Sequence, residues 1–228
     1  MKGRDFMNKN VLILILIIVA AAACFFAFRQ GGGGSTDGVL ASIAESSGTF
    51  SVNSKPAKIG YSLKAGDIVE VGPDSYALIK YKQDGYELML FASKTSKENA
   101  RCEIKPLKSE SKTFVINLIN GILTFFVPPA DQRTSTLEIT ADDAVVSIRQ
   151  TKGKVENSLS QLKVALVNGK VNVNYKGTDT EVAAGQQLFY DKAGAKKIEV
   201  KPYDFYDKTE QEYYYKGKVD NNPVVNDK

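Results

Sequence analysis

Short apolar runs, separated by turn-forming residues, fill the chain from about residue 48 to residue 200. In "GTFSVN", residues 48–53, Phe50 and Val52 alternate with small polar residues, which is the two-residue period of a half-buried strand. Similar short runs continue to the end of this region: "SYALIKY", "YELMLF", "TFVINLINGILTFFV", "TLEIT", "AVVSI", "LKVALVNGKVNVNY", "QQLFY" and "KKIEV". No stretch here keeps a 3.6-residue period, so the pattern predicts an all-β domain with little helix.

Two dipeptides inside this region are typical of tight turns between strands. Asp84-Gly85 lies between "SYALIKY" and "YELMLF", and Asp-Gly between apolar runs is a strong hairpin signal. Asn120-Gly121 interrupts the apolar run at 113–127, so we expect a turn there as well.

Two parts of the region also resemble each other weakly. "GTFSVN" leads to "LKAGD", so that Gly66 lies 18 residues after Gly48, and "GKVNVN" leads to "VAAGQ", so that Gly185 lies 16 residues after Gly169. Repetition of this kind is typical of folds that stack similar β units. The predicted fold is therefore a solenoid-like or sandwich stack of short antiparallel strands.

The N-terminal part of the chain has a different pattern. Residues 11–28, "VLILILIIVAAAACFFAF", contain no charged side chain. As a helix they would span about 27 Å, close to the thickness of a bilayer's hydrocarbon core. Lys2, Arg4 and Lys9 precede the run, so the positive-inside rule places residues 1–10 in the cytoplasm and the rest of the chain outside. We expect one transmembrane helix that anchors an exported body.

Two other interpretations of residues 11–28 are possible. A cleaved signal peptide is disfavoured, because its apolar stretch normally has about 7–15 residues. Lipidation at Cys24 is the alternative, because "AAAC" resembles a bacterial lipobox, although "FFAF" follows Cys24 where small polar residues are usual. After the span, "GGGGST" makes residues 29–38 a glycine-rich, flexible tether.

The composition excludes several common chemistries. The sequence has no histidine and only two cysteines, so histidine-based triads, histidine-ligated metals and cysteine-rich zinc sites cannot form. The net charge of +4 is concentrated near the N-terminus, where residues 1–29 hold four of the 30 basic residues and one of the 26 acidic ones. The remaining body is nearly neutral and has little electrostatic drive to bind nucleic acid. We expect no cofactor and no nucleic-acid partner.

Few residues are candidates for catalysis. Asp142-Asp143 is the only adjacent pair of acidic residues, and neighbouring side chains on a strand point to opposite faces. Asp67 and Ser75 have no base beside them with which to form a triad. Cys102 has no disulfide partner except the membrane-embedded Cys24, so we expect it to be a buried small apolar residue. The chain is therefore expected not to be an enzyme.

Aromatic residues cluster in the last segment of the chain, residues 201–228. Tyrosine rings are common at binding surfaces, because the ring is apolar and the hydroxyl tolerates water. The candidate partner contacts are Tyr203, Phe205, Tyr206, Tyr213, Tyr214 and Tyr215. The alternative interpretation is that these rings cover the open end of the β core.

Three motifs, in this order, resemble the FecR domain, which is named for the iron-dicitrate sensing regulators. The stretch "LKAGDIVEVGPDSYALI" at 63–79, followed by "DGYELML", is similar to the opening of that domain. "INGILTFFV" resembles its central strand, and "VALVNGKVNVNY…VAAGQQ" resembles its closing strands. The resemblance covers residues 39–200.

The resemblance implies a periplasmic β domain without enzymatic activity, attached to the bacterial inner membrane through one span. In such a domain the glycine-rich motifs are architecture, and the expected structural turn residues are Gly66, Asp67, Gly72, Gly121, Gly169 and Gly185. Gly66 and Gly72 would occupy turns that need a positive φ, and Asp67 would bond the backbone of its own turn.

The expected function is a membrane-anchored binding or scaffold module of the cell envelope. Its partner would be another envelope protein or cell-wall glycan. The alternative is a regulator of transmembrane signalling that works through a partner protein. Regulators of the FecR family have a cytoplasmic anti-sigma region before the span, whereas only "MKGRDFMNKN" precedes it here, which favours the first interpretation.

Overall fold

Strands account for nearly all of the chain that the structure describes. The computed structural model describes residues 38–92, 97–149 and 151–203. These residues contain 17 strands and one 3₁₀ helix of three residues, η1 (Ala130–Gln132), which confirms the predicted all-β class and the scarcity of helix. Within the described ranges, no helix has the length and apolar character needed to cross a bilayer. The predicted span at residues 11–28 lies outside these ranges.

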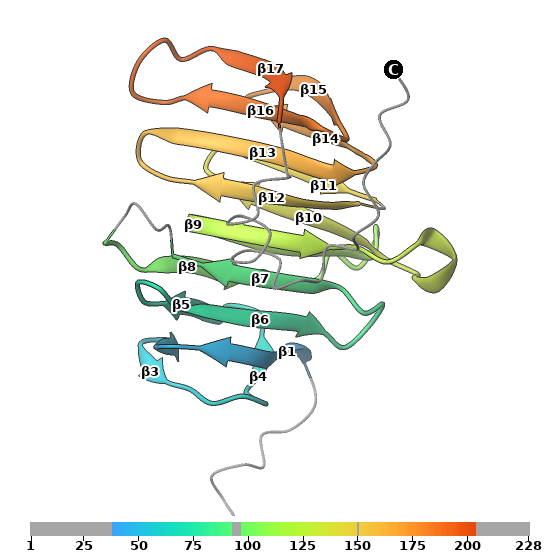
Figure 1. Ribbon diagram of the computed structural model, residues 1–228. Coiled ribbons are helices and arrows are strands. Elements are labelled where there is room, and N and C mark those ends of the chain that lie inside the picture. The colour runs from blue at the N-terminus through green and yellow to red at the C-terminus, as the bar shows by residue number, and fades with distance from the viewer. Residues whose placement is uncertain (1–37, 93–96, 150, 204–228) are drawn as a thin grey trace, which may run out of the picture. The chain divides into compact units, whose positions relative to one another are not determined.

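The strands form two sheets that pack face to face (Figure 1). Sheet A consists, in order across the sheet, of β4 (Ser62–Lys64), β1 (Val39–Ser47), β6 (Tyr76–Tyr81), β7 (Glu87–Phe91), the second part of β9 (Thr113–Phe126), β12 (Lys152–Asn157), β13 (Gln161–Asn168), β16 (Gln186–Asp191) and β17 (Ile198–Pro202). Sheet B consists of β3 (Lys55–Pro56), β2 (Phe50–Val52), β5 (Ile68–Val71), β8 (Ala100–Ile104), the first part of β9, β10 (Thr136–Ala141), β11 (Ala144–Ile148), β14 (Lys170–Tyr175) and β15 (Thr178–Ala183).

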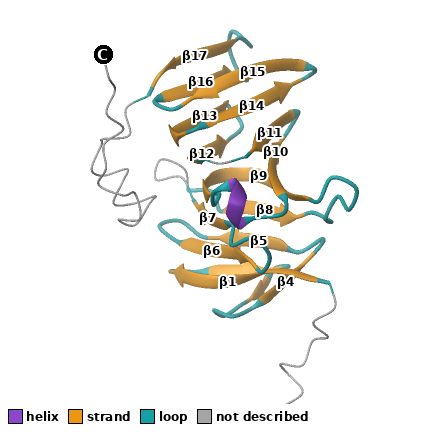
Figure 2. Ribbon diagram, turned by 90° about the vertical axis from the view of Figure 1, so that its right-hand side faces the viewer, coloured by secondary structure: helices purple, strands orange, loops and turns teal. Residues whose placement is uncertain are grey.

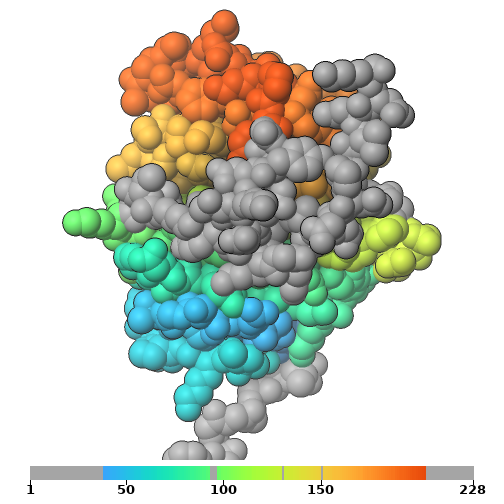
Figure 3. Space-filling view, viewed as in Figure 1, coloured from blue at the N-terminus to red at the C-terminus, as the bar shows by residue number. Residues whose placement is uncertain are grey.

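The chain builds this sandwich by making a hairpin in one sheet and then crossing to the other. The hairpins β6–β7, β12–β13 and β16–β17 lie in sheet A, and β10–β11 and β14–β15 lie in sheet B. Successive layers therefore stack in sequence order, from the blue to the orange end in Figures 1 and 3. This confirms the prediction of a solenoid-like or sandwich stack of short antiparallel strands.

One pairing in the stack is parallel. Strand β10 runs beside the first part of β9 in the same direction, so the chain must return across the molecule between them. The returning segment carries η1, on the side that Figure 2 turns toward the viewer. Asp84, in the β6–β7 turn, holds the end of this segment, because its carboxylate accepts a hydrogen bond from the Thr134 backbone amide at 3.0 Å and another from the Ser135 hydroxyl.

These hydrogen bonds also set the ionisation of Asp84. Burial alone would raise the pKa of the carboxyl, but the donors from Ser135 and Thr134 outweigh it and hold the pKa below its ordinary value. The charged form of Asp84 is thus the form that the folded chain favours. The hairpin predicted at Asp84-Gly85 is confirmed, with φ of +63° and +66° at the two residues.

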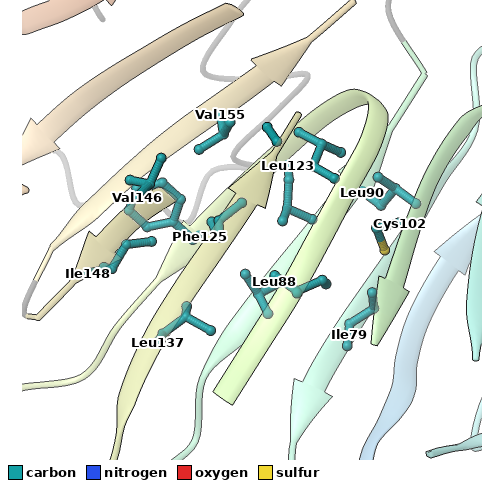
Figure 4. Packing of buried hydrophobic residues seen from close by; sticks show 14 of the residues in the cluster. Ile79, Leu88, Leu90, Cys102, Leu123, Phe125, Leu137, Val146, Ile148 and Val155 are labelled. Carbon is teal, nitrogen blue, oxygen red and sulfur yellow. The ribbon is translucent and has the colours of Figure 1, made fainter. Parts of the chain in front are cut away.

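The core lies between the two sheets. Alternate residues of each strand point inward, including Ile79, Leu88 and Leu123 from sheet A and Ile139 and Val146 from sheet B, all fully buried. Figure 4 shows part of this cluster, with side chains from both sheets filling the space between them. Burial of this apolar area is the main source of stability in a domain of this kind.

The expected turn at Asn120-Gly121 is wrong, because β9 continues through it as one strand. Gly121 has φ of +103°, which bends the strand so that its first part lies in sheet B and its second part in sheet A. A Cβ atom at Gly121 would lie 2.3 Å from the Ala100 Cβ and 2.9 Å from the Phe91 carbonyl oxygen. Only glycine fits this crossing without displacing its neighbours.

The weak internal repetition has a structural counterpart in these crossings. Gly48 and Gly169 both lie where the chain passes from sheet A to sheet B, between β1 and β2 and between β13 and β14. The glycines that end the two similar stretches, Gly66 and Gly185, are not equivalent. Gly66 leads from β4 in sheet A to β5 in sheet B, whereas Gly185 leads from β15 in sheet B to β16 in sheet A. The repeat therefore marks corners of the sandwich and not equivalent pairs of strands.

Candidate interaction site

A cavity of about 340 Å³ opens at one end of the strands, where turns from both sheets meet the bend of β9. The cavity is lined by Glu98, Ile119, Asn120, Asp142, Asn157, Ser158, Leu159 and Lys192. Asp142 lies in the β10–β11 turn of sheet B, whereas Ser158 and Leu159 lie in the β12–β13 turn of sheet A. We call this cavity with its rim the corner pocket.

Lys192 ties the walls of the corner pocket together. Its ammonium group, on a side chain only 17% exposed, donates to the Asp142 carboxylate, to the Asn157 Oδ1 at 2.5 Å and to the Ser158 carbonyl at 2.6 Å. All three protons of the group are therefore used, and Asp142 balances its charge. Lys192 thus links the two sheets, and its ammonium group has no proton left to donate to a ligand.

The β12–β13 turn is fixed from within as well. The Asn157 amide, 2% exposed, donates to the backbone carbonyls of Leu118 and Ile119 at 3.0 and 2.9 Å. Across the turn, the Ser158 amide donates to the Gln161 carbonyl at 3.0 Å, and the Gln161 amide donates to the Ser158 hydroxyl at 3.2 Å. The turn is therefore a rigid support.

Leu159 stands at the tip of this support, 88% exposed. Ile119, 37% exposed, lies on the same rim. A single exposed apolar residue is ordinary, but Leu159 on its turn and Ile119 in β9 together give the cavity an apolar rim. That combination suits a protein partner, because an anchor held in place loses little conformational entropy on binding.

A second surface of interest is the outer face of sheet A. Facing residues of neighbouring strands form rows across the sheet, one of which contains Tyr76, Phe91 and Ile122 and the next Leu78 and Met89. These five side chains form a separate apolar cluster, with exposed fractions between 1% and 8%. We call this cluster the outer patch.

Polar groups border the outer patch on both sides. The Tyr76 hydroxyl donates to the Glu45 carboxylate, and this hydrogen bond, with burial, raises the pKa of Tyr76 to about 12. On the other side, Lys154 is 5% exposed, and its ammonium group donates to the Tyr203 hydroxyl and lies 4.8 Å from the centre of the Tyr203 ring. Tyr203 thus packs over β12, on the same face as the outer patch.

Two of the predicted turn residues lie together at the corner between β4 and β5. Gly66 has φ of +89°, the left-handed conformation that favours glycine. The Asp67 carboxylate accepts hydrogen bonds from the Lys64 amide at 2.8 Å, within its own turn, and from the Asn53 side chain at 2.7 Å. Both residues therefore shape the backbone of this corner.

Gly72 differs from the expectation of a positive φ, since its φ is not in that region. A side chain is disfavoured here for a different reason: a Cβ atom would lie 2.3 Å from the Thr49 Oγ1, so the Thr49 hydroxyl would have to move. The Gly72 amide donates to the Thr49 carbonyl at 3.0 Å, which brings two corners of the sandwich side by side. The expectation of a positive φ was wrong, and it is close packing against Thr49 that favours glycine at this position.

The other two predicted turn glycines lie at one further pair of corners. Gly169 and Gly185 have φ of +75° and +73°. The Ala184 amide donates to the Gly169 carbonyl at 2.9 Å, so the two corners are neighbours in space. Of the predicted aromatic contacts, the structure places Tyr203, and the other five lie outside the described residues.

The residues considered for catalysis do not come together. Asp142 and Asp143 lie in a turn and not on a strand as expected, and they pair with different lysines, Lys192 and Lys176. Cys102 is fully buried in the core, as predicted, and burial raises the pKa of its thiol. Within the described ranges, no group of three or more Cys, Asp or Glu residues could hold a metal ion.

The described body is thus an all-β domain of two packed sheets. Comparison with protein-family models gives no match, and neither does comparison with curated proteins. Two solved structures are similar in fold: crystal structures, at 2.50 and 1.65 Å resolution, of a candidate anti-sigma factor from Parabacteroides distasonis ATCC 8503. Each has 15% sequence identity, a TM-score of 0.49 and a match to 60% of this chain. The matched part spans 61% and 60% of the lengths of those chains.

Sequence reasoning missed the corner pocket. Lys192 and Asp142 are 50 positions apart, and no local pattern connects them. Leu159 did give a signal, since a leucine between two serines, in a turn between two strands, has no core to enter.

Proposed function

We propose that this chain is a membrane-anchored, FecR-like domain of the bacterial cell envelope that binds a partner protein and is not an enzyme. One observation carries the proposal: Leu159, 88% exposed, is held on a rigid turn at the rim of the corner pocket. An apolar anchor beside a recess is typical of protein interfaces, and it favours an envelope protein over glycan as the partner. The sequence motifs at 63–90 and 161–187 support the FecR-like assignment.

The binding proposal is tested with Leu159→Ser in the full chain. Crosslinking in cells, followed by mass spectrometry, measures how much partner is recovered with each variant. Loss of a central apolar anchor costs about 2 kcal/mol, so recovery should fall by tenfold or more. Because the side chain is exposed, the melting temperature should stay within about 2 °C of that of the wild type.

Ile59→Ser is the matched control. Ile59 is another exposed aliphatic residue, 60% exposed, in the segment between β3 and β4, and it does not line the corner pocket. It should leave recovery unchanged. Equal recovery with wild type and Leu159→Ser would contradict the proposal, and equal losses with both variants would show that no particular surface is used.

The anchor and its orientation are a separate part of the proposal. A phosphatase joined after Gly34 should be active, because the charge asymmetry around residues 11–28 exports everything beyond the span. Membrane retention should survive Cys24→Ala. Release of that variant, or loss of labelling by a fatty-acid probe, would instead assign the anchor to lipidation.

The second candidate function is regulation of transmembrane signalling through the same bound partner. The resemblance of residues 39–200 to the FecR domain favours it. A transcriptional reporter decides between the two, since Leu159→Ser should change a signalling output only if the bound partner relays a signal.

A further inference from the structure

The outer patch is buried although it faces away from the core. Phe91 is 1% exposed, Ile122 is 2% and Met89 is 4%, and Thr124 of β9 and Lys154 of the adjoining β12 are each 5% exposed. In Figure 1, where sheet A faces the viewer, no described strand or helix lies in front of β6, β7, β9 and β12. Within the described ranges, Tyr203 covers Lys154, and nothing accounts for the cover over the rest of this face.

The strands under the outer patch are apolar on both faces. In β6 and β7 nearly every residue is buried, whereas strands of a sheet with one solvated face alternate between buried and exposed. Three layers are needed to bury both faces of such a sheet. Sheet B and the core supply the cover on one side only.

The chain itself leads onto this face. Tyr203, which follows β17, already packs over Lys154 of β12 on the outer side of sheet A. From β12 to β6 are three strand spacings, about 14 Å. The next twelve residues could reach about 40 Å if extended, so residues 204–215 can cross the whole patch.

The composition of residues 204–215, "DFYDKTEQEYYY", matches this face. Phe205, Tyr206 and the three tyrosines at 213–215 provide five rings, and four acidic residues outnumber one lysine. Lys152 and Lys154 lie on the outer face between β17 and the patch. The other nearby segment outside the described ranges, 93–96 or "SKTS", has no apolar side chain with which to cover the patch.

We propose that residues 204–215 dock in the same molecule on the outer face of sheet A, with their aromatic rings over the outer patch. The docked segment forms the third layer of the domain. The aromatic residues of the tail are then part of the folded body and are not free to contact a partner. This inference is independent of the corner pocket and of the binding proposed there.

Met89 offers a direct test, because it is the only methionine between residues 39 and 228. In the full-length chain, oxidation of Met89 by peroxide is followed by peptide mass spectrometry. The variants Phe205→Ser/Tyr206→Ser and Tyr213→Ser/Tyr214→Ser/Tyr215→Ser should each oxidise at Met89 about tenfold faster than the wild type, because the cover is weakened. Val224→Ser/Val225→Ser, outside the docking segment, is the matched control and should oxidise at the wild-type rate.

Cys102 reports on the core in the same samples, since it is fully buried between the sheets. If Met89 oxidises faster while Cys102 stays unmodified, the outer patch has been uncovered without unfolding of the core, and the proposal is supported. Wild-type protection of Met89 in both segment variants overturns the proposal.

A second measurement needs no substitution and decides the matter if a variant unfolds. Carbodiimide treatment of the wild-type chain should join Lys152 or Lys154 to a carboxylate within 204–215. In an equal mixture of ¹⁴N- and ¹⁵N-labelled chains, the two peptides of each crosslink should carry the same isotope, because both come from one chain. Crosslinks between isotopes would assign the cover to a second copy, and crosslinks to Asp5 or Asp37 would assign it to the N-terminal segment. Either result, or the absence of crosslinks to 204–215, overturns the proposal.

Discussion

The two sheets of this sandwich present outer faces of opposite character. On sheet B, charged side chains pair across the surface: Arg101 with Glu70 at 3.2 Å and Lys105 with Glu103 at 2.7 Å. On sheet A, the corresponding positions of β6, β7 and β9 hold the apolar outer patch. Strands such as β8 and β10 alternate strictly between buried and partly exposed residues, whereas β7 is buried at four of its five positions.

The difference shows how a strand's sequence indicates the number of layers around it. A strict two-residue alternation, as in "ARCEI" and "TLEITA", predicts one face in the core and one in water. A nearly continuous apolar run, as in "ELMLF", predicts burial on both faces and hence a further covering layer. The two sheets share one core but not one kind of environment.

The largest effect is expected where the two sheets are joined. Gly121→Val should prevent stable folding, because a Cβ atom would clash with Ala100 and the Phe91 carbonyl and the backbone has a positive φ. Gly66→Val adds the same strain where nothing lies within 4 Å of the new Cβ, so it should cost only about 1–2 kcal/mol. Asp67→Ala, which loses turn hydrogen bonds, should cost about 1 kcal/mol. Urea unfolding measures all three, and equal losses at the two glycines would contradict the crossing role of Gly121.

The outer faces can be compared directly with one substitution on each. Ile122→Ser on sheet A should lower the free energy of unfolding by about 3 kcal/mol, because a side chain that is 2% exposed is replaced by a small polar one. Val145→Ser, on the outer face of sheet B opposite Thr140 and Asn174, should cost less than about 1 kcal/mol. Similar costs in thermal or urea unfolding would show that the two faces do not differ as described.

A smaller effect, which depends on pH, is expected at Asp84. Its folded pKa lies below the ordinary value of 3.8, so its ionised form stabilises the folded chain. That contribution is present above about pH 4 and is lost as the pH falls through the folded pKa. Asp84→Asn should therefore melt a few degrees below the wild type at pH 7, and the difference should shrink toward pH 3. A difference that is constant with pH would mean that the charge of Asp84 plays no part.

The smallest effect is expected on the solvated face. Lys170 and Glu181 form an ion pair at 3.0 Å with side chains 70% and 63% exposed. Pairs in water contribute little, so Glu181→Gln should change the free energy of unfolding by less than about 0.5 kcal/mol. A loss above about 1 kcal/mol would show that the polar face of sheet B contributes more than its exposure suggests.

Local patterns in the sequence predicted the strand class and the Asp84-Gly85 hairpin, since both depend on neighbouring residues. The same reasoning failed at Asn120-Gly121, because a dipeptide that suits a tight turn also suits a bend between two sheets. The parallel pairing of β9 with β10 depends on a return segment, so no alternation within either strand could indicate it.

The candidate sites were predicted less completely than the fold. The turn residues Gly66 and Asp67 were identified from their own motif. The corner pocket depends on Lys192, in the β16–β17 turn, meeting Asp142 in the β10–β11 turn and Asn157 at the end of β12, which only the folded chain brings together. The apolar runs at 76–81 and 87–91 contained the evidence for a covered outer face, but an apolar run alone does not reveal what covers it.

The order of the strands also has a mechanical consequence. Strand β1 lies near one end of the stack and β17 at the other, and every strand runs across the line between them (Figure 1). A pull between these ends would load the hydrogen bonds of each ladder in turn, as in a zipper, and not all together in shear. The domain would then lengthen at low force, one hairpin at a time from β17 inward. Unfolding under force would first meet strong resistance at β9, because this strand is hydrogen-bonded in both sheets.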